Sequence, residues 1–314
     1  MDISVVVPTY NRRDIVARSL ETLFAQDFPP WRFDIIVVVD GSTDGTAVAL
    51  REMRPPCAFR VIEQENRGPA GARNTGFRAA QSDLVLFLDD DMRCDPGLLL
   101  AHAKAHQRFG TGVVFGALFL AADSKANLAS ECFKREIGAF HLQYRTAPQS
   151  KFEVGSITFS NASLPREMLA AEGGFDESFR MREDLELAIR LRENGVRLDY
   201  APDAIARQYY EKTATDLLAD AERFAIADVN LAKKHPGQLI EGHVRWLVKE
   251  RGWKTTLRNA VARFPVLEKT LLAPGCALGE RFFAFGPLRS VGVRALQMRR
   301  RIHWLRVVKR LTHS

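Results

Sequence analysis

Two uninterrupted runs of mostly β-branched residues do most to define the fold of this chain. They read ISVVV at residues 3–7 and DIIVVV at residues 34–39. Uninterrupted apolar strands are typical of sheets that are buried on both faces. Between the runs, Ile15, Leu20 and Leu23 follow a mostly helical spacing. The sequence therefore predicts an α/β fold built on a mostly parallel, Rossmann-like sheet that is flanked by helices.

The alternation of strand and helix continues along the chain, as parallel sheets with right-handed crossovers require. Strands are predicted in FRVIEQ from Phe59 and in LVLFL at 84–88, with a helix from Pro69 between them. Further on, the pattern predicts a strand in GVVFGALFLA, a helix over 123–146, a strand in FEVGSITFSNASL, a helix in EDLELAIRLRENG, short strands at 196–200 and 204–209, and only helices from about Thr213. We expect two domains, residues 1–212 and a helical extension over residues 213–314.

Bulk properties favour a cytoplasmic protein. The chain has 314 residues, of which 46% are hydrophobic, but no apolar run approaches the roughly 18 residues that cross a bilayer. The amino terminus lacks the pattern of a secretory signal. The four cysteines are scattered without a CxxC pair, which favours free thiols in a reducing compartment over a disulfide framework or a zinc site.

Three consecutive carboxylates follow the strand at 84–88, in LVLFLDDDMRCDP. Like charges this close are tolerated cheaply only beside solvent or a cation. One interpretation is a solvated turn in which Asp95 caps the next helix. The other is a shared site, because ligands bind at the carboxyl ends of parallel strands and the strand at 34–39 also ends in an aspartate, Asp40.

Two further segments carry candidate functional residues. NRGPAGARN at 66–74 lacks both GxGxxG and GK[ST], so it does not support dinucleotide or P-loop binding, but Arg73 could pair with a phosphate or an aspartate. MREDLELAIRL places Glu183 and Asp184 in the first turn of a helix, where acids ordinarily serve as caps. The preceding GGFDESF indicates a fixed loop that aims these acids.

Taken together, five segments resemble the inverting glycosyltransferases of family 2, which have the GT-A nucleotide-diphospho-sugar transferase fold. The resemblance covers roughly residues 1–210 and rests on SVVVPTYNR, VVVDGSTDGT, NRGPAGARNTGFRAA, LVLFLDDD and GGFDESFRMREDLELAIRLRENG. It implies that Pro8, Thr9 and Tyr10 contact the base and ribose of the donor nucleotide. It also implies that Asp40 holds the base and that Arg73 organises the nucleotide pocket.

The resemblance places the family's Asp-x-Asp motif on the triple aspartate. Asp89 and Asp90 would contact the donor, Asp89 in the ribose or metal shell, and Asp91 would be a metal ligand together with Asp89. A Mg²⁺ or Mn²⁺ ion there would neutralise the clustered carboxylates and stabilise the departing diphosphate. Many relatives supply another ligand, a histidine after the last core strand. Gln208 stands at about that position.

The family's acidic pair falls on Glu183 and Asp184, and Asp184 would be the general base that takes the proton of the acceptor hydroxyl. The implied reaction moves a sugar from a nucleotide-diphosphate donor to a glycan or lipid-linked acceptor, in bacterial surface polysaccharide or glycolipid synthesis. One alternative is a sugar nucleotidyltransferase, although PTYNRRD lacks the glycine-rich loop of that class. The other is a nucleotide-sugar-binding protein with a decayed site.

Positive charge is concentrated at the carboxyl end. Residues 289–314 carry eight Lys or Arg and no acid, whereas the remainder has 37 basic and 38 acidic side chains. An apolar stripe runs through this segment, with Trp304 at its edge: Val291, Ala295, Met298, Ile302, Leu305 and Val308. Such a helix could bind an anionic membrane surface, in which case the chain would be a peripheral protein at the inner face of the cell membrane. Alternatively, the helix could pack on its own domain. No stacking motif or fold supports nucleic-acid binding.

Overall fold

The computed structural model describes residues 1–110, 112–146, 158–236 and 260–312, and the chain divides into two compact units. The first unit comprises Met1–Asp123 and Ile137–Tyr209 and contains the sheet. The second unit comprises Ser124–Glu136 and Tyr210–Ser314, and its described elements are helices. Residues 124–136 thus belong with the helical unit, a feature absent from the expected division at residue 212.

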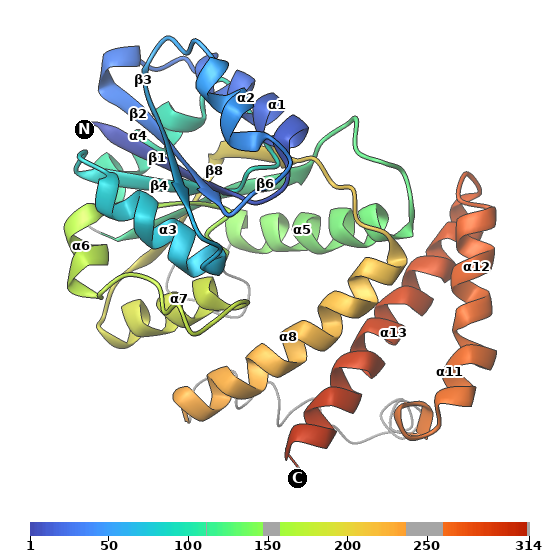
Figure 1. The fold of residues 1–314 in the computed structure, drawn as a ribbon. Helices are drawn as coiled ribbons and strands as arrows, with labels where there is room; N and C mark the ends of the chain where they lie inside the picture. Colours follow the sequence, from blue (N-terminus) through green and yellow to red (C-terminus); the bar gives the residue numbers. More distant parts are fainter. Residues whose placement is uncertain (111, 147–157, 237–259, 313–314) are drawn as a thin grey trace. The chain divides into compact units, whose positions relative to one another are not determined.

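Within the described residues, the first unit contains an eight-stranded sheet of order β3-β2-β1-β4-β7-β6-β8-β5. Figure 1 labels β1 to β4, β6 and β8 of this sheet. Neighbouring strands pair in parallel except at β7 and β5, which run antiparallel to their neighbours. The strands are β1 (Ile3–Thr9), β2 (Phe33–Asp40), β3 (Ala58–Gln64), β4 (Leu84–Leu88), β5 (Met92–Cys94), β6 (Val113–Leu120), β7 (Asn161–Pro165) and β8 (Leu198–Gln208). The predicted α/β class with a mostly parallel sheet is confirmed.

Several local predictions differ from the structure. The two short strands predicted at 196–200 and 204–209 are one strand, β8, with an irregularity in register opposite Gly116 and Ala117 of β6. Of the strand predicted in FEVGSITFSNASL, β7 holds the last part, and residues 152–157 lie outside the described residues. The short strand β5 was not predicted. Asp95 does not cap the following helix, because its carboxylate accepts two hydrogen bonds from Arg207.

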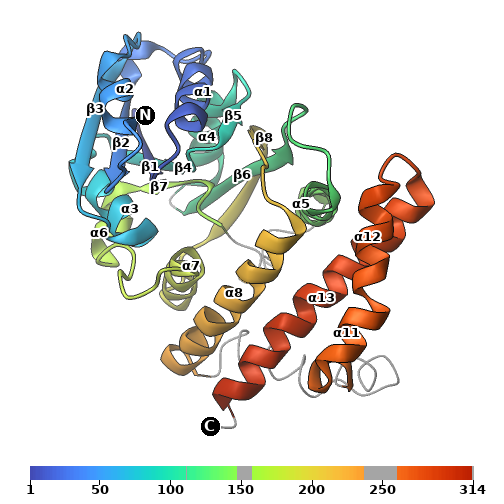
Figure 2. The ribbon, with the colours of Figure 1, turned by 45° about the vertical axis from the view of Figure 1, so that its right-hand side comes forward.

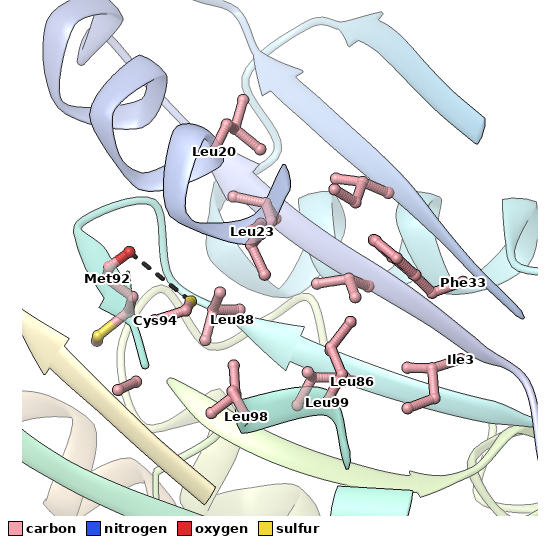
Figure 3. Close-up of a cluster of buried hydrophobic side chains, with 14 of the residues drawn as sticks. Ile3, Leu20, Leu23, Phe33, Leu86, Leu88, Met92, Cys94, Leu98 and Leu99 are labelled. Atoms are coloured by element: carbon pink, nitrogen blue, oxygen red, sulfur yellow. Dashed lines mark hydrogen bonds between the residues drawn. The ribbon is translucent and has the colours of Figure 1, made fainter. Parts of the chain in front are cut away.

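Helices cover both faces of the sheet, which explains why its strands are apolar without alternation. In β1, Val5 and Val7 point into a core shared with α1 (Arg13–Phe24), α2 (Thr46–Glu52) and α4 (Leu98–Phe109). Figure 3 shows the leucines of α1, β4 and α4 meeting in this core. On the opposite face, α3 (Gly68–Ala79) lies so close to Val6 that a side chain at Gly76 would collide with it. The first unit also contains η1 (Pro30–Arg32), α6 (Arg166–Ala171) and α7 (Glu183–Glu193), and the helix α5 (Leu128–Thr146) is shared between the two units.

In the second unit, α13 (Gly286–Thr312) lies between α8 (Ala214–Lys234) and α12 (Ala273–Arg281) (Figure 2). The short helix α11 (Pro265–Leu271) precedes α12 in the sequence. The predicted apolar stripe of α13 is mostly packed inside this unit. Val308 lies against Ala225 and Val229 of α8, and Ile302 and Leu305 lie against Val261 and Ala262. Most of the stripe is therefore covered by protein and is not available for insertion into a membrane.

Polar contacts also tie α13 to its own unit. Trp304 donates its indole N–H to Asp228 at 2.8 Å. Arg299 and Arg306 both pair with the buried carboxylate of Glu268. Of the two interpretations of the basic segment, the structure shows packing on its own domain. In the described part of the chain, no helix is both long and apolar enough to cross a membrane.

The close packing of α3 against the sheet can be tested by substitution of Gly76. A Cβ atom at residue 76 would lie 2.3 Å from Cγ1 of Val6, a stiff and fully buried side chain. We expect Gly76→Ala to lower the free energy of unfolding by about 1–3 kcal/mol, as overpacking does. In Gly138→Ala, the matched control in α5, the new methyl group would meet no atom within 4 Å. That variant should be neutral or slightly stabilising, because alanine is the better helix former. Urea unfolding measures both, and equal stabilities would contradict the packing described.

Candidate active site

Four strand ends bring polar side chains to one edge of the sheet in the first unit. Thr9 ends β1, Asp40 ends β2, and Gln208 ends β8. The triple aspartate follows β4 directly, at residues 89–91. The sequence patterns placed these residues at carboxyl ends of strands, and the structure shows that several of them are in contact.

Asp90 is the structural member of the triple aspartate. Its carboxylate accepts a hydrogen bond from Thr9 Oγ1 at 2.7 Å and one from Arg12 Nη1 at 2.7 Å. Its main-chain carbonyl accepts a hydrogen bond from Ser19 Oγ at 2.7 Å. These contacts tie the end of β4 to β1 and α1. With both carboxylate oxygens engaged, Asp90 holds the loop in place, so that its neighbours can face the site.

Asp91 lies between Arg12 and Gln208. Arg12 Nη1 is 3.1 Å from Oδ2 of Asp91, and Gln208 Nε2 donates to both oxygens at 3.0 and 3.2 Å. The carboxyl group is almost fully buried. Burial, with the charges of Asp90 and Asp89, raises the pKa of Asp91 to about 7. Gln208 therefore meets Asp91 in space, and in this structure it acts as a hydrogen-bond donor to the carboxylate.

A buried arginine joins the triple aspartate to the acidic pair of α7. Arg73 of α3 donates through Nη2 to Asp89 Oδ1 at 2.8 Å and through Nη1 to Oε1 of Glu183. Burial opposes the charge of Arg73, but Asp89 and Glu183 outweigh it and raise its pKa. The guanidinium also lies 5.7 Å from the centre of the Phe175 ring. Segments that are 16 and 110 residues from Arg73 in sequence are thereby held together.

Glu183 and Asp184 form the first turn of α7, as predicted. Arg182 precedes them in the left-handed region, with φ of 67°. Burial raises the pKa of Glu183 to about 7, with Arg73 opposing the shift and Asp184 adding to it. Burial also raises the pKa of Asp184, while Arg73 and Arg182 oppose it. Asp184 accepts a hydrogen bond from the backbone N–H of Leu185 at 2.8 Å and keeps part of its surface accessible.

The loop that leads into α7 is fixed by aromatic packing. The Phe175 ring meets Phe87 of β4 at 5.1 Å and Phe159 at 5.3 Å between ring centres, both edge to face. Asn74 of α3 donates to the carbonyl of Phe175 and accepts from its N–H. The predicted fixed loop is therefore present, and it positions the acids at the start of α7.

Asp40 is fully engaged by the protein. Its Oδ1 accepts from Gln64 Nε2 at 2.6 Å and from the N–H of Arg67 at 2.8 Å, and its Oδ2 accepts from the N–H of Gly68 at 2.9 Å. The carboxylate thus satisfies backbone donors at the start of α3. Its predicted contact with a base stays a prediction.

The turn after β1 combines a buried and an exposed part. Thr9 is buried against Asp90, Pro8 is half-buried, and the Tyr10 side chain is 51% exposed. Asn11, with φ of 51°, accepts a hydrogen bond from the N–H of Thr43 at 2.8 Å. That bond joins the turns after β1 and β2. The exposed ring of Tyr10 is free of the core and available to a planar ligand.

The carboxylates of the site suit a divalent cation by charge and by ligand type. Among the described residues, no group of three or more His, Cys, Asp or Glu is arranged to hold a metal ion. Carboxylates nevertheless outnumber guanidinium groups in and beside the site. The carboxylates are those of Asp89, Asp90, Asp91, Glu183 and Asp184, and the guanidinium groups are those of Arg12, Arg73 and Arg182. Mg²⁺ is commonly bound through one or two carboxylates, and substrate phosphates supply further oxygens. Asp89 and Asp91 fit that requirement.

Arg12 was missed by the sequence reasoning. It sits two residues after Tyr10 in PTYNRRD, and nothing in that segment shows that its guanidinium reaches Asp90 and Asp91. Burial opposes its charge, but these two carboxylates raise its pKa. Arg12 therefore supplies positive charge at the point where the clustered aspartates need it.

A buried histidine pair behind the site was also missed. His102 Nε2 lies 2.9 Å from Oδ1 of Asn161, and Ser163 Oγ lies 2.8 Å from both His102 Nδ1 and His106 Nε2. Asn161 donates to the carbonyl of Ala204 at 2.9 Å, so its Oδ1 must accept from His102. Every contact in the network is then satisfied with both histidines neutral. The i, i+4 spacing in HAKAH was the available signal.

This network supports the site because β7 borders the triple aspartate. Asn161 is the register partner of Leu88, the last residue of β4. The N–H of Asp89 donates to the carbonyl of Ser160 at 3.2 Å. The buried polar cluster thus fixes the strand beside which Asp89 leaves the sheet.

The mixed α/β fold with a mostly parallel sheet is that of the GT-A type transferases, and comparisons with known proteins agree. The model of the family described as "Glycosyl transferase family 2" matches residues 4–170. Because that match covers more than half of the chain, the chain belongs to glycosyl transferase family 2. The predicted family is confirmed.

The chain is similar to several characterised proteins. It is 30% identical over 294 residues to validoxylamine A glucosyltransferase of Streptomyces hygroscopicus subsp. limoneus, covering 83% of this chain and 62% of that protein. Its fold resembles mannosyltransferase PcManGT from Pyrobaculum calidifontis, solved with GDP-Man and Mn²⁺, at a TM-score of 0.65 and 20% identity, covering 98% and 87% of the chains. It also resembles S. aureus TarS 1-349, solved with UDP, at a TM-score of 0.55 and 19% identity, covering 100% and 92%. At these identities the structures show that the fold is shared.

The buried histidine pair predicts acid sensitivity. Burial lowers the pKa of His102 and His106 to about 4, from 6.5. Below pH 6.5 these histidines bind protons in the unfolded chain but stay neutral in the folded chain. The free energy of unfolding therefore falls as the pH falls from 6.5 towards 4. At pH 5 the loss should be about 2 kcal/mol for each histidine.

His102→Gln tests this prediction, because an amide can keep hydrogen bonds to Asn161 and Ser163 but does not titrate. Urea unfolding at pH 7 and pH 5 should show a smaller acid-dependent loss in this variant than in the natural protein. His141→Gln, at a less buried histidine, should keep most of the natural loss. The prediction is wrong if His102→Gln loses as much stability as the natural protein.

Proposed function

We propose that this chain is an inverting glycosyltransferase that moves a sugar from a nucleoside-diphosphate donor to a hydroxyl acceptor. The observation that carries the proposal is the bridge from Asp89 through Arg73 to Glu183, which brings a donor-side aspartate and an acid pair to one edge of the sheet. Family membership supports the same reaction class. A glycan or lipid-linked acceptor in bacterial surface polysaccharide or glycolipid synthesis is the acceptor class that we propose.

Asp184 is the general base in this proposal. Its Oδ1 is held by the N–H of Leu185, which leaves Oδ2 to take the proton of the acceptor hydroxyl as that oxygen attacks the anomeric carbon. Its place at the amino end of α7 favours the carboxylate form, because the helix dipole is positive there. Burial works the other way and raises its pKa. Glu183 pairs with Arg73 and orients the start of the helix.

The donor side uses the remaining candidate residues. Asp89 and Asp91 would hold Mg²⁺ or Mn²⁺, whose charge would stabilise the departing diphosphate. Tyr10 would stack on the base, because its ring is exposed at the carboxyl end of β1. Thr9, Pro8 and the backbone around Asp40 would shape the nucleoside pocket. Arg12 would keep Asp91 in place by pairing with it before the donor arrives.

A peripheral position at the inner face of the cell membrane would bring the site to a lipid-linked acceptor. The support is the excess of basic residues at 289–314. Because the apolar stripe of α13 is packed inside its own unit, any contact with lipid must use another surface.

Asp184→Asn tests the proposed base. The amide keeps the size of the side chain but cannot take a proton, so transfer should fall by roughly 10² to 10⁴-fold with little change in donor binding. Release of nucleoside diphosphate from a panel of nucleotide sugars measures turnover. Glu193→Gln, at the exposed far end of the same helix, is the matched control and should keep normal turnover. Near-normal turnover in Asp184→Asn would leave Asp184 a capping role only. Release of pyrophosphate from a nucleoside triphosphate and a sugar 1-phosphate, supplied together in a separate assay, would instead indicate a nucleotidyltransferase.

Asp91→Asn tests the proposed metal ligand. A ligand that binds only the folded state raises the melting temperature. We expect Mn²⁺ and a matching nucleoside diphosphate together to raise the melting temperature of the natural protein and to have little effect on Asp91→Asn. Asp83→Asn, at the exposed opposite end of β4, is the control and should respond like the natural protein. An equal response in Asp91→Asn would remove this aspartate from the metal site.

A further inference from the structure

Exposed apolar side chains gather in one short part of the second unit. Among the described residues, fourteen large apolar side chains are exposed, and seven of them lie between residues 264 and 291. The seven are Phe264, Val266, Leu271, Leu278, Phe282, Phe285 and Val291. Scattered single residues of this kind are normal on a protein surface, whereas a cluster marks an interaction site.

The arrangement of α12 shows that this cluster is an outward face. On its inner side, Cys276 and Gly279 are buried, and a side chain at Gly279 would come within 2.5 Å of the Gly292 backbone of α13. The outer side of α12 carries the exposed residues Pro274, Ala277, Leu278 and Arg281, and Phe282 and Phe285 are exposed in the turn that follows the helix. The helix is therefore apolar on both sides, and packing on α13 uses the inner side alone.

Arginines accompany the phenylalanines of this region. Arg263 lies 5.7 Å from the centre of the Phe264 ring, Arg281 lies 5.6 Å from that of Phe282, and Arg289 lies 5.3 Å from that of Phe283. A phenyl ring beside a guanidinium places an apolar group and a phosphate-binding group at the same depth. The boundary between lipid headgroups and acyl chains offers partners to both.

The charge of the surroundings is strongly positive. Residues 260–312 carry eleven Lys or Arg and two acids. Glu268 is buried and paired with Arg299 and Arg306, and Glu280 accepts a hydrogen bond from the N–H of Leu128. Since Glu268 is buried and paired, little negative charge is left on this surface, which suits an anionic partner.

We propose that the outer face of α11, α12 and the turn after α12, centred on Leu278, Phe282 and Phe285, docks onto an anionic phospholipid bilayer. The phenyl rings enter the headgroup region, and Lys269 and Arg281 meet lipid phosphates. A second copy of this chain fits the face less well, because two basic surfaces repel each other. The inference does not rest on the proposed transfer reaction.

Vesicle flotation with the full chain tests the proposal, with vesicles of phosphatidylcholine alone and of phosphatidylcholine with phosphatidylglycerol. The natural protein should float with the anionic vesicles only, and less so at high salt, which screens the charges. In the double variant Phe282→Ser/Phe285→Ser, binding should fall by about tenfold or more, because the inserted apolar area is lost. In Lys269→Gln/Arg281→Gln it should fall several-fold.

Matched controls carry the same changes at exposed positions elsewhere. Val48→Ser/Ile226→Ser and Arg51→Gln/Arg78→Gln should bind vesicles like the natural protein. Melting temperatures check that every variant is folded. The proposal is overturned if the natural protein does not bind anionic vesicles, if it binds neutral vesicles equally, or if the controls lose as much binding. The natural protein could instead self-associate without lipid, and Phe282→Ser/Phe285→Ser could abolish that association. This result would identify a second copy of the chain as the occupant of the face and would also overturn the proposal. Because the readout is vesicle binding, failure here leaves the glycosyl-transfer proposal untouched.

Discussion

The candidate active site depends on the buried guanidinium of Arg73. A charge this deeply buried must be paired, and its partners, Asp89 and Glu183, come from the end of β4 and the start of α7. Removing either partner would leave the buried arginine with a single carboxylate. The large cost of desolvating the charges of this remaining pair would then be less well compensated. Among the described residues its Nε has no hydrogen-bond partner, and the hydrogen bonds of this side chain run through its two Nη atoms. The ion pairs therefore fix the distance between the donor side and the acid pair.

The negative charges of Asp90 and Asp91 are compensated to different degrees. Asp90 is neutralised by Arg12 and used to hold β1, α1 and β4 together. Asp91 shares the same arginine, so its negative charge is only partly compensated, and burial together with the charges of Asp90 and Asp89 raises its pKa. A divalent cation bound together with the donor would bring positive charge to the place where the protein lacks it. The resting protein thus tolerates the triple aspartate through Arg12 and Gln208, and donor binding would relieve the remaining repulsion.

Features of the fold that depend on local sequence could be predicted, and those that depend on distant contacts could not. The β-branched runs predicted buried strands, and the aspartates at strand ends predicted where Asp40 and Asp89 would emerge. The role of Arg12 could not be predicted, because its partners lie about eighty residues away. For the same reason, sequence did not show that Asp40 caps α3, a contact that links residues 40 and 68.

The carboxyl-terminal segment shows why an amphipathic pattern alone does not decide between protein and lipid. The stripe that includes Ile302 and Leu305 matches an interfacial helix in periodicity and charge, yet both residues are covered by the helical unit. A stripe specifies only that something apolar must cover it. The outer face of α12 and the turn after it differ, because Phe282 and Phe285 remain exposed after the inner face of α12 has packed closely at Gly279. Apolar surface that persists after folding indicates a partner outside the chain, and in basic surroundings that partner is expected to be anionic.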